Sequence, residues 1–179
     1  MKTLTLLRHA KSSWDDPAES DFDRPLNRRG QAAARAMGRE MRALGLEFDA
    51  VRASPARRVV ETLQVAAESY GRDLDTVFDR RIYLASFDML LDIVRGAPDA
   101  ADRLLLAGHN PGFERLALAL MRDDGNRMRT EITVKYPTAA LAEIALPIDH
   151  WRDAVPGMGR LIRFIRPRDL DPALGPDGS

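Results

Sequence analysis

Short apolar runs alternate with longer amphipathic segments along this chain, and that alternation is the feature that most constrains its fold. Residues 2–7 read KTLTLL and residues 103–107 read RLLLA, patterns typical of strands, the second of a strand buried on both faces. Because strands and helices alternate, a mostly parallel sheet covered by helices on both faces is favoured. The sequence therefore predicts an α/β fold, a three-layer α/β/α sandwich with a mostly parallel central sheet.

The same patterns predict the remaining elements. Composition and helical spacing predict helices over 28–44, 56–70, about 86–95 and about 113–122. Asn27 and Ser86 are candidate caps, and Gly45 and Gly71 are candidate stops. Further strands are predicted at 49–54, 131–136, 139–146 and 160–166, and residues 76–85 leave a short strand open. Residues 10–27 are polar and predict a long loop.

The organisation of the chain indicates one domain. Its 179 residues contain no internal repeat and no Gly/Ser linker, so a single catalytic domain is predicted over residues 1–166. Residues 167–179 read PRDLDPALGPDGS, a Pro-, Gly- and Asp-rich composition that favours a loose C-terminal tail.

Composition excludes several classes of function. Lys+Arg and Asp+Glu both number 27, so a broad nucleic-acid-binding surface is disfavoured. The absence of cysteine excludes disulfides, thiolate catalysis and cysteine-based metal sites. No apolar stretch reaches the roughly 18 residues of a membrane span, and the first apolar run stops at Leu7, before Arg8. We therefore expect a cytoplasmic protein that binds neither nucleic acid nor membrane.

Residues with chemical potential follow the predicted strands. Of the three histidines, His9 follows the first strand together with Arg8, and His109 follows the strand at 103–107. Arg57 and Arg58 open the helix that follows the strand at 49–54. Ligands of open α/β sheets bind at the carboxyl ends of the strands. Guanidiniums, imidazoles and a helix N-terminus converging there suit a dianionic group such as phosphate.

Metal and nucleotide sites have no support in the sequence. His150 lies beside Trp151 in a loop bounded by prolines and is expected at the surface. The dispersed histidines form no HExxH-type pattern, so a zinc site is disfavoured. Neither GxxxxGK[ST] nor GxGxxG occurs. We expect no metal and no cofactor.

Three segments carry a family resemblance. LLRHAKSSW, around His9, resembles the Arg-His-Gly/Ala signature of the histidine phosphatase superfamily, also called phosphoglycerate mutase-like. SPARRVVET is similar to its Ser-Pro-x-x-Arg-x-x-Glu/Gln-Thr segment, which selects Arg58 rather than Arg57. AGHNPGFERLA resembles the segment with the family's second histidine, and the three together span roughly residues 1–120. RHAKSSW, DFDRPLNRRG and GHNPG most resemble the small, single-domain SixA-type phosphohistidine phosphatases.

The resemblance implies a phosphoglycerate mutase-like fold and a metal-independent phosphatase. In that reading His9 is the covalent nucleophile, and Arg8, Arg58 and His109 surround the phosphoryl group, with His109 protonated once the dianion is bound. The two arginines disfavour an imidazolium at His9, which keeps it nucleophilic. Together with His109 they supply the positive charge that Mg²⁺ supplies elsewhere, and water then hydrolyses the phosphohistidine.

Further residues are candidates for contact with the substrate. They lie next to the two histidines or in the polar loop: Lys11, Ser13, Arg24 and Asn110. For Lys11 and Ser13 an ordinary loop role stays open. Arg24 has the alternative of bracing the loop onto the following helix. The acidic side chains of residues 15–23 are expected to form a solvated loop face, and repulsion of acidic substrates or supply of a proton stays open for them.

Departures from the family pattern bear on the substrate. Position 10 is Ala where many relatives have Gly, a change of small expected effect. The stretch DRRIYLASFDMLL offers no glutamate where the mutase branch has its general acid, only Asp79 and Asp88, and Asn110 follows His109 where acid phosphatases have Asp. The missing proton donor favours a labile P–N bond, hence phosphohistidine on a partner protein, unless the 12–27 loop supplies an acid. The alternatives are a phosphatase for small phosphomonoesters and a catalytically silent phosphate-binding module.

Overall fold

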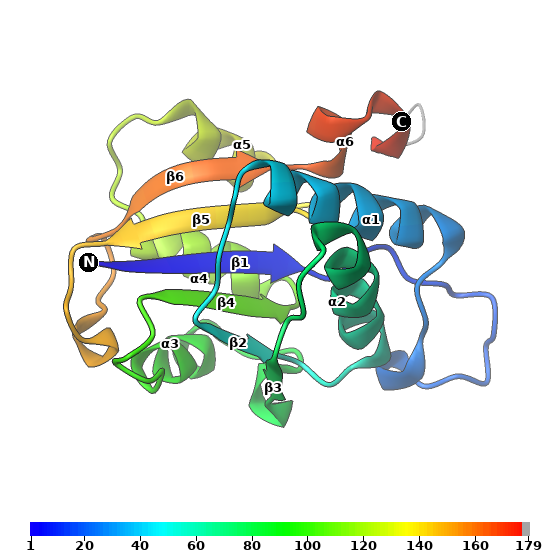
Figure 1. Cartoon of the computed structure of the whole chain (residues 1–179), viewed down its shortest axis with the longest axis horizontal. Coiled ribbons are helices and arrows are strands. Elements are labelled where there is room, and N and C mark those ends of the chain that lie inside the picture. Colours follow the sequence, from blue (N-terminus) through cyan, green and yellow to red (C-terminus); the bar gives the residue numbers. More distant parts are fainter. Residues whose placement is uncertain (177–179) are drawn as a thin grey trace.

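A six-stranded sheet forms the middle layer of the protein in the computed structural model, which describes residues 1–176 (Figure 1). Its strands, in the spatial order β3-β2-β4-β1-β5-β6, are β1 (Lys2–Arg8), β2 (Ala50–Ala53), β3 (Thr76–Phe78), β4 (Arg103–Gly108), β5 (Leu141–Leu146) and β6 (Arg160–Ile165). The first four in that order pair in parallel, whereas β5 is antiparallel to both β1 and β6. The predicted mostly parallel sheet is confirmed.

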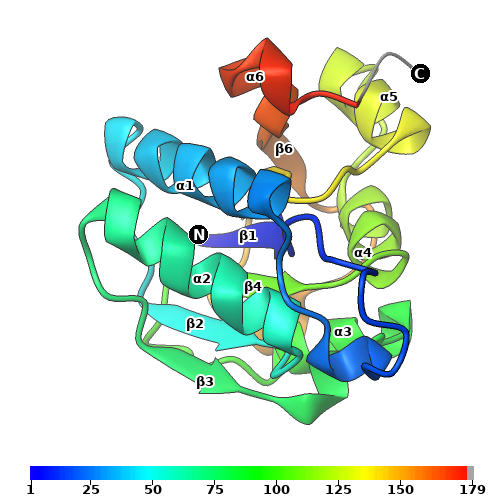
Figure 2. The same ribbon diagram turned by 90° about the vertical axis from the view of Figure 1, so that its right-hand side faces the viewer.

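Helices cover both faces of the sheet (Figure 2). One face carries α1 (Arg28–Ala43) and α2 (Arg57–Tyr70), which pack against each other, and the other carries α3 (Phe87–Arg95), α4 (Gly112–Leu120) and α5 (Arg127–Val134). The short helix α6 (Pro167–Leu170) contacts α1. No helix within residues 1–176 is long and apolar enough to cross a membrane.

The apolar runs of the sequence are the central strands of the sheet. On β4, Leu104 and Leu106 pack in the core beneath α3 and α4, whereas Leu105 packs in the core beneath α1 and α2. Both faces of the strand are therefore buried, which is why its apolar run is continuous rather than alternating. Burying each of these leucines contributes about 2 kcal/mol to folding.

The helix ends agree with the capping residues expected from the sequence. Asn27 Oδ1 accepts from the N–H of Gly30 at 2.8 Å, and Ser86 Oγ accepts from the N–H of Met89 at 3.3 Å. Gly71 ends α2 with a φ of 77°, a conformation that favours glycine. These contacts satisfy backbone groups that have no partner within the helix.

One glycine determines how closely α1 approaches the loop after β1. A Cβ at Gly30 would lie 2.0 Å from the carbonyl oxygen of Lys11, a contact that no side chain tolerates. The backbone N–H of Asn27 donates to the same oxygen at 3.0 Å. The start of α1 is thereby fixed against the residues that follow β1.

The strand expected at 131–136 is wrong. Residues Arg127–Val134 form α5, with Asn126 Oδ1 accepting from the N–H of Met128 at 2.9 Å as its cap. Only Ile132 of this helix is buried, where it joins the core, and the following residues 133–135 are exposed. Packing of α5 against α4 and β6 therefore outweighs the strand-like composition of TEITV.

The segment for which the sequence favours a loose tail has regular structure over residues 167–174. It consists of α6 and a 3-10 turn over Pro172–Leu174, and Pro167 is buried. Arg29 of α1 donates from Nη2 to Ala173 O at 3.4 Å. Residues 177–179 of the expected tail lie outside the described part of the chain. The assignment of residues 1–166 to one catalytic domain stays a prediction.

Candidate active site

The carboxyl ends of β1 and β4 bring two histidines together. The strands are parallel neighbours in which Arg8 is aligned with Gly108, and the N–H of His9 donates to Gly108 O at 3.0 Å. The residues that follow, His9 and His109, are therefore adjacent, with ring centroids 5.3 Å apart. Both side chains are buried. Two residues far apart in the sequence thus share one position at the edge of the sheet.

His9 is held in one tautomer. Its Nδ1 lies 2.7 Å from the carbonyl oxygen of Ala10, so Nδ1 carries a proton and donates it, and Nε2 keeps its lone pair. Burial, reinforced by the charges of Arg8 and Arg58, holds the pKa of His9 well below its usual range. At neutral pH this imidazole is uncharged, which is the form that can attack an electrophile.

His109 is also neutral. Arg58 Nη2 lies 3.3 Å from His109 Nδ1, and because a guanidinium can only donate, Nδ1 is the acceptor. The proton of the ring is then on Nε2, which donates to Ser54 Oγ at 2.8 Å. Burial, and then the charge of Arg58, lowers the pKa of His109 to about 3.

Arg58, rather than Arg57, joins the histidines. The side chain of Arg58 is 2% exposed and lies in the first turn of α2, at the end of β2. Arg57 lies at the surface, where its Nε donates to Glu61 Oε1 at 2.8 Å. The alignment that selects Arg58 therefore agrees with the geometry.

Arg8 is anchored on a backbone carbonyl. Its Nη1 donates to Tyr136 O at 2.9 Å, and Asn110 Nδ2 donates to the same oxygen at 3.0 Å. Asn110 Oδ1 accepts from the N–H of Glu114, which orients the amide. Arg8 Nε is buried and has no hydrogen-bond partner among the described residues. Asn110 is thus adjacent to Arg8, and contact with substrate stays a prediction for it.

An aspartate from the 12–27 loop lies against Arg58. Asp21 Oδ2 accepts from Arg58 Nη2 at 3.1 Å and from the Tyr83 hydroxyl at 2.5 Å, and Asp21 Oδ1 accepts from Arg24 Nη2 at 3.0 Å. Partial burial raises the pKa of Asp21, but hydrogen bonds from Tyr83 and Arg24 and the charge of Arg58 outweigh this and lower it to about 2. Asp21 is exposed, as expected of the acidic loop face, and it also bonds to Arg58.

Arg24 braces the loop. Besides Asp21, its guanidinium donates to Ser12 Oγ and lies 3.5 Å from the centre of the Trp14 ring. The side chain is buried, and its contacts stay within the 12–27 loop, so the alternative in which Arg24 braces the loop onto the following helix is not supported by them. A further contact between Arg24 and substrate stays a prediction.

The remaining two candidates differ in exposure. Ser13 is half-buried, and its hydroxyl accepts from the N–H of Asp15 at 3.1 Å within a local turn. Lys11 is exposed and, together with Arg8, lines a cavity of about 300 Å³. Lys11 therefore lies at the rim of the site, whereas the hydroxyl of Ser13 already has a partner in the loop.

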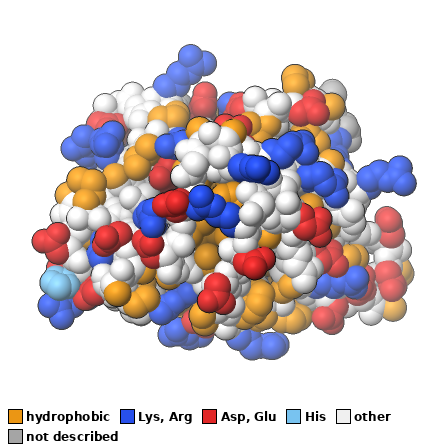
Figure 3. Space-filling model, viewed as in Figure 1, with side chains coloured by type: hydrophobic (Ala, Val, Ile, Leu, Met, Phe, Trp, Pro, Cys, Tyr) orange, Lys and Arg blue, Asp and Glu red, His pale blue; other side chains and the backbone are white. Residues whose placement is uncertain are grey.

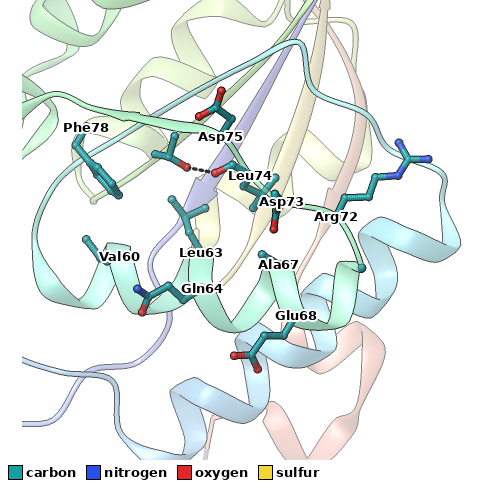
Figure 4. Close-up of a pocket in the computed structure, with 12 residues that line it drawn as sticks. Val60, Leu63, Gln64, Ala67, Glu68, Arg72, Asp73, Leu74, Asp75 and Phe78 are labelled. Atoms are coloured by element: carbon teal, nitrogen blue, oxygen red, sulfur yellow. Dashed lines mark hydrogen bonds between the residues drawn. The ribbon is translucent and has the colours of Figure 1, made fainter.

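A larger cavity lies elsewhere. It has a volume of about 1020 Å³ and lies between α2 and the segment leading into β3. Figure 4 shows Leu63 of α2 and Phe78 of β3 among its lining side chains. None of the predicted site residues lines it, so its size does not mark it as the catalytic site.

Comparison with known proteins shows the family of this chain. Residues 4–82 match the histidine phosphatase superfamily (branch 1). The uncharacterized protein Rv1276c of Mycobacterium tuberculosis is 33% identical over 164 residues, which cover 90% of this chain and 100% of that protein. The chain belongs to the histidine phosphatase superfamily.

Solved structures show the same fold for this histidine phosphatase. A protein provisionally named phosphohistidine phosphatase SixA, from Agrobacterium tumefaciens, is 27% identical with a TM-score of 0.78, over 92% of this chain and 97% of that one. The protein histidine phosphatase SixA complexed with tungstate has a TM-score of 0.76 at 19% identity, over 94% and 99% of the two chains, and shares the fold. The predicted phosphoglycerate mutase-like fold of the SixA type is confirmed, and the chain is a phosphatase.

The sequence patterns of this histidine phosphatase did not predict two residues that lie at the site, Thr62 and Ser54. Thr62 Oγ1 accepts from the N–H of Ala10 at 2.9 Å and donates to Arg58 O at 2.6 Å, which ties α2 to the residue after His9. Its spacing of four residues from Arg58, on the same helix face, was the available signal. Ser54 orients His109, and its position directly after β2 was the corresponding signal.

Acidic and imidazole groups at the site do not gather as metal ligands do. Across residues 1–176, no cluster of three or more histidine, aspartate or glutamate side chains is arranged to hold a metal ion. The third histidine, His150, lies at the surface, 2.9 Å from Asp99.

Proposed function

We propose that this phosphatase hydrolyses phosphohistidine on a partner protein, with His9 as a covalent nucleophile. The observation that carries the proposal is the state of His9: a buried, neutral imidazole whose Nδ1 is fixed on Ala10 O, so that Nε2 keeps its lone pair. Arg8 and Arg58 lie beside it as cations for the phosphoryl oxygens. His109 completes the site.

The proposed reaction consists of two displacements at phosphorus. In the first, the Nε2 lone pair of His9 attacks phosphorus, the P–N bond of the substrate breaks, and its electron pair stays on the leaving imidazole nitrogen. The ring of phosphorylated His9 keeps its proton on Nδ1, which donates to Ala10 O, so the ring carries a positive charge. In the second, water attacks phosphorus, the bond to His9 Nε2 breaks, and the water proton goes to the released phosphate.

The electrostatics of Asp21 favour a leaving group that needs no proton donor. Asp21 is the carboxyl group next to Arg58, and its pKa of about 2 makes it an anion at neutral pH. An alkoxide leaving group requires a proton, which an ionised carboxylate does not hold. A phosphohistidine ring protonated at its other nitrogen leaves as neutral imidazole without further proton transfer. The class of substrate that best fits this site is thus a phosphoramidate.

An exposed aromatic side chain at the edge of the loop supports a protein substrate. Trp14 is 73% exposed although its ring stacks on Arg24. Exposed tryptophans of this kind are common in protein–protein contacts and uncommon on other surfaces. Trp14 is therefore a candidate contact for the partner that carries the phosphohistidine.

The first test measures phosphate release from a phosphohistidine peptide, with para-nitrophenyl phosphate in parallel and EDTA in excess. We expect turnover of the peptide that survives EDTA and exceeds turnover of the aryl phosphate. Aryl phosphate turnover with an inert peptide would move the substrate to small phosphomonoesters. Loss of all activity in EDTA would contradict a metal-independent reaction.

The covalent role of His9 has a matched control in the surface histidine His150. We expect His9→Ala to lower kcat by at least about a thousandfold. With a substrate that carries a radioactive phosphoryl group, wild-type protein quenched during turnover should retain label that is stable in alkali and lost in acid, and His9→Ala should retain none. His150→Ala keeps both, because His150 lies at the surface beside Asp99. Substantial turnover by folded His9→Ala, checked by circular dichroism, would contradict the covalent mechanism.

A further inference from the structure

A second group of cations lies next to the site. The cavity of about 300 Å³ that adjoins Arg8 is lined by residues from the β1 end, α1, the 135–138 segment and the C-terminal segment. Its cationic lining residues are Arg8, Lys11, Arg29, Lys135, Arg166 and Arg168. Of the described residues that line it, none is acidic. Figure 3 shows several Lys and Arg side chains over the region where Figure 1 has α1.

Part of this charge is offset by nearby groups and part is not. Arg166 Nη2 donates to Asp169 Oδ1 at 2.9 Å, so its charge is paired. In contrast, the side chains of Lys11, Lys135 and Arg168 make no hydrogen bond or ion pair within residues 1–176, although the charge of Arg168 helps to lower the pKa of Asp169. These three are exposed at the rim of the cavity. A cavity with unpaired cations and no acidic lining residue raises the local concentration of anions.

The cavity is connected to the catalytic site through Arg8. The same side chain precedes His9 in the sequence and lines the cavity, and its buried Nε has no hydrogen-bond partner among the described residues. The guanidinium of Arg8 would therefore lie between an anion in the cavity and the phosphoryl group on His9. A substrate with a second anionic group close to the transferred phosphoryl group could occupy both places at once.

We propose that this cavity is a subsite for a second anionic group of the substrate, a carboxylate or a phosphate, contacted by Arg8, Lys11, Lys135 and Arg168. The proposal rests on the proposed function, because it assigns the second group to the molecule that phosphorylates His9. A carboxylate would come from acidic residues beside the phosphohistidine of a partner protein. A phosphate would come from a small compound that carries more than one.

The test compares two phosphohistidine peptides that differ only in their neighbours, two glutamates in one and two glutamines in the other. At low ionic strength we expect wild-type kcat/KM to favour the glutamate peptide by about three- to tenfold, since each exposed charge pair contributes little. In the double variant Lys135→Met, Arg168→Met the ratio falls towards one. The matched control Arg152→Met, Arg160→Met removes two exposed cations that do not line the cavity, and keeps the ratio.

Three outcomes of this comparison overturn the subsite for a carboxylate of a partner protein. They are a wild-type ratio near one, a ratio that survives the Lys135→Met, Arg168→Met double variant, and an equal loss in both double variants. The last would mean that overall charge, rather than the cavity, sets the preference. Circular dichroism of each variant checks that the fold is retained.

A binding experiment separates failure of the subsite from failure of the proposed function. If wild type turns over neither peptide, the proposed phosphohistidine activity is wrong, and calorimetric titration with inorganic phosphate and inorganic tripolyphosphate then decides on the subsite. We expect tripolyphosphate to bind about three- to tenfold more tightly, and this gain to disappear in Lys135→Met, Arg168→Met but not in the control. No gain in wild type would overturn the subsite. A gain without a peptide preference would assign the second group to a small phosphate compound.

Discussion

The two arginines beside His9 lie in regions of opposite electrostatic character. Arg58 is surrounded by side chains that accept from it: the carboxylate of Asp21 and the imidazole of His109. Arg8 donates to a backbone carbonyl, that of Tyr136, and borders a cavity whose described lining residues include no acid. The Arg58 side of His9 is therefore neutralised by a direct carboxylate contact, whereas on the other side Arg8 has only the charge of Glu114 without a hydrogen bond to it, next to a cavity lined by cations.

This difference gives the two sides different properties: the Arg58 side is rigid, and the Arg8 side attracts anions. On the Arg58 side, a network of hydrogen bonds through Asp21 and Arg24 holds the loop and the guanidinium in place, as expected of preorganised charge. On the Arg8 side, exposed cations such as Lys135 attract anions but are free to move. We therefore expect substitutions on the first side to act on turnover and substitutions on the second to act on substrate preference.

The largest effect is expected from Arg58→Ala. The substitution removes a buried cation beside the phosphoryl position and leaves Asp21 as an anion without that partner, so kcat/KM falls by about a hundred- to a thousandfold. Arg57→Ala is the matched control and changes kcat/KM less than about threefold, because Arg57 pairs with Glu61 at the surface. Steady-state kinetics measures both, and a larger loss in Arg57→Ala would contradict the assignment.

The next effect concerns the pH dependence of stability near Arg58. His109 has a pKa of about 3 in the folded protein, against a usual value of about 6.5 in an unfolded chain. Below pH 6.5 the unfolded chain takes up a proton at His109 and the folded protein does not, so the free energy of unfolding falls as pH falls. Between pH 6.5 and 5 this loss is about 2 kcal/mol. Urea unfolding at pH 6.5 and pH 5 measures this loss of unfolding free energy, which should be smaller by this amount in His109→Asn than in wild type. Equal losses in both proteins would contradict a neutral His109.

The smallest effect is expected from Asp21→Asn. Removing the carboxylate that neutralises Arg58 should tighten binding of inorganic phosphate by about threefold, measured by calorimetry. Because the pKa of Asp21 is lowered to about 2, its ionised form stabilises the fold above pH 4, and this contribution is lost as pH falls from about 4 to 2. The variant should therefore show a shallower decline of melting temperature over that range. Weaker phosphate binding by Asp21→Asn would contradict the prediction that the Asp21 carboxylate opposes phosphate binding at Arg58.

Much of the fold could be predicted because its causes are local. The continuous apolar run of β4 and the amphipathic pattern of α1 each indicate which faces are buried. His9 and His109 could be placed together because both follow central strands, and strand ends of a parallel sheet share one edge. The strand expected at 131–136 was wrong because TEITV has strand-like composition, and the packing of α5 on α4 and β6 is not visible in composition.

The sequence by itself determined the layered α/β fold and the pairing of the two histidines, since periodicity reports local burial, and the family resemblance of SPARRVVET selected Arg58. Only the tertiary structure decided that Asp21 neutralises Arg58, that Arg8 rests on the carbonyl of Tyr136, and that Lys135 and Arg168 line one cavity with it. These residues come from separate segments of the chain. Which segments meet depends on how the helices pack across the sheet, and no local pattern encodes the electrostatic balance that results.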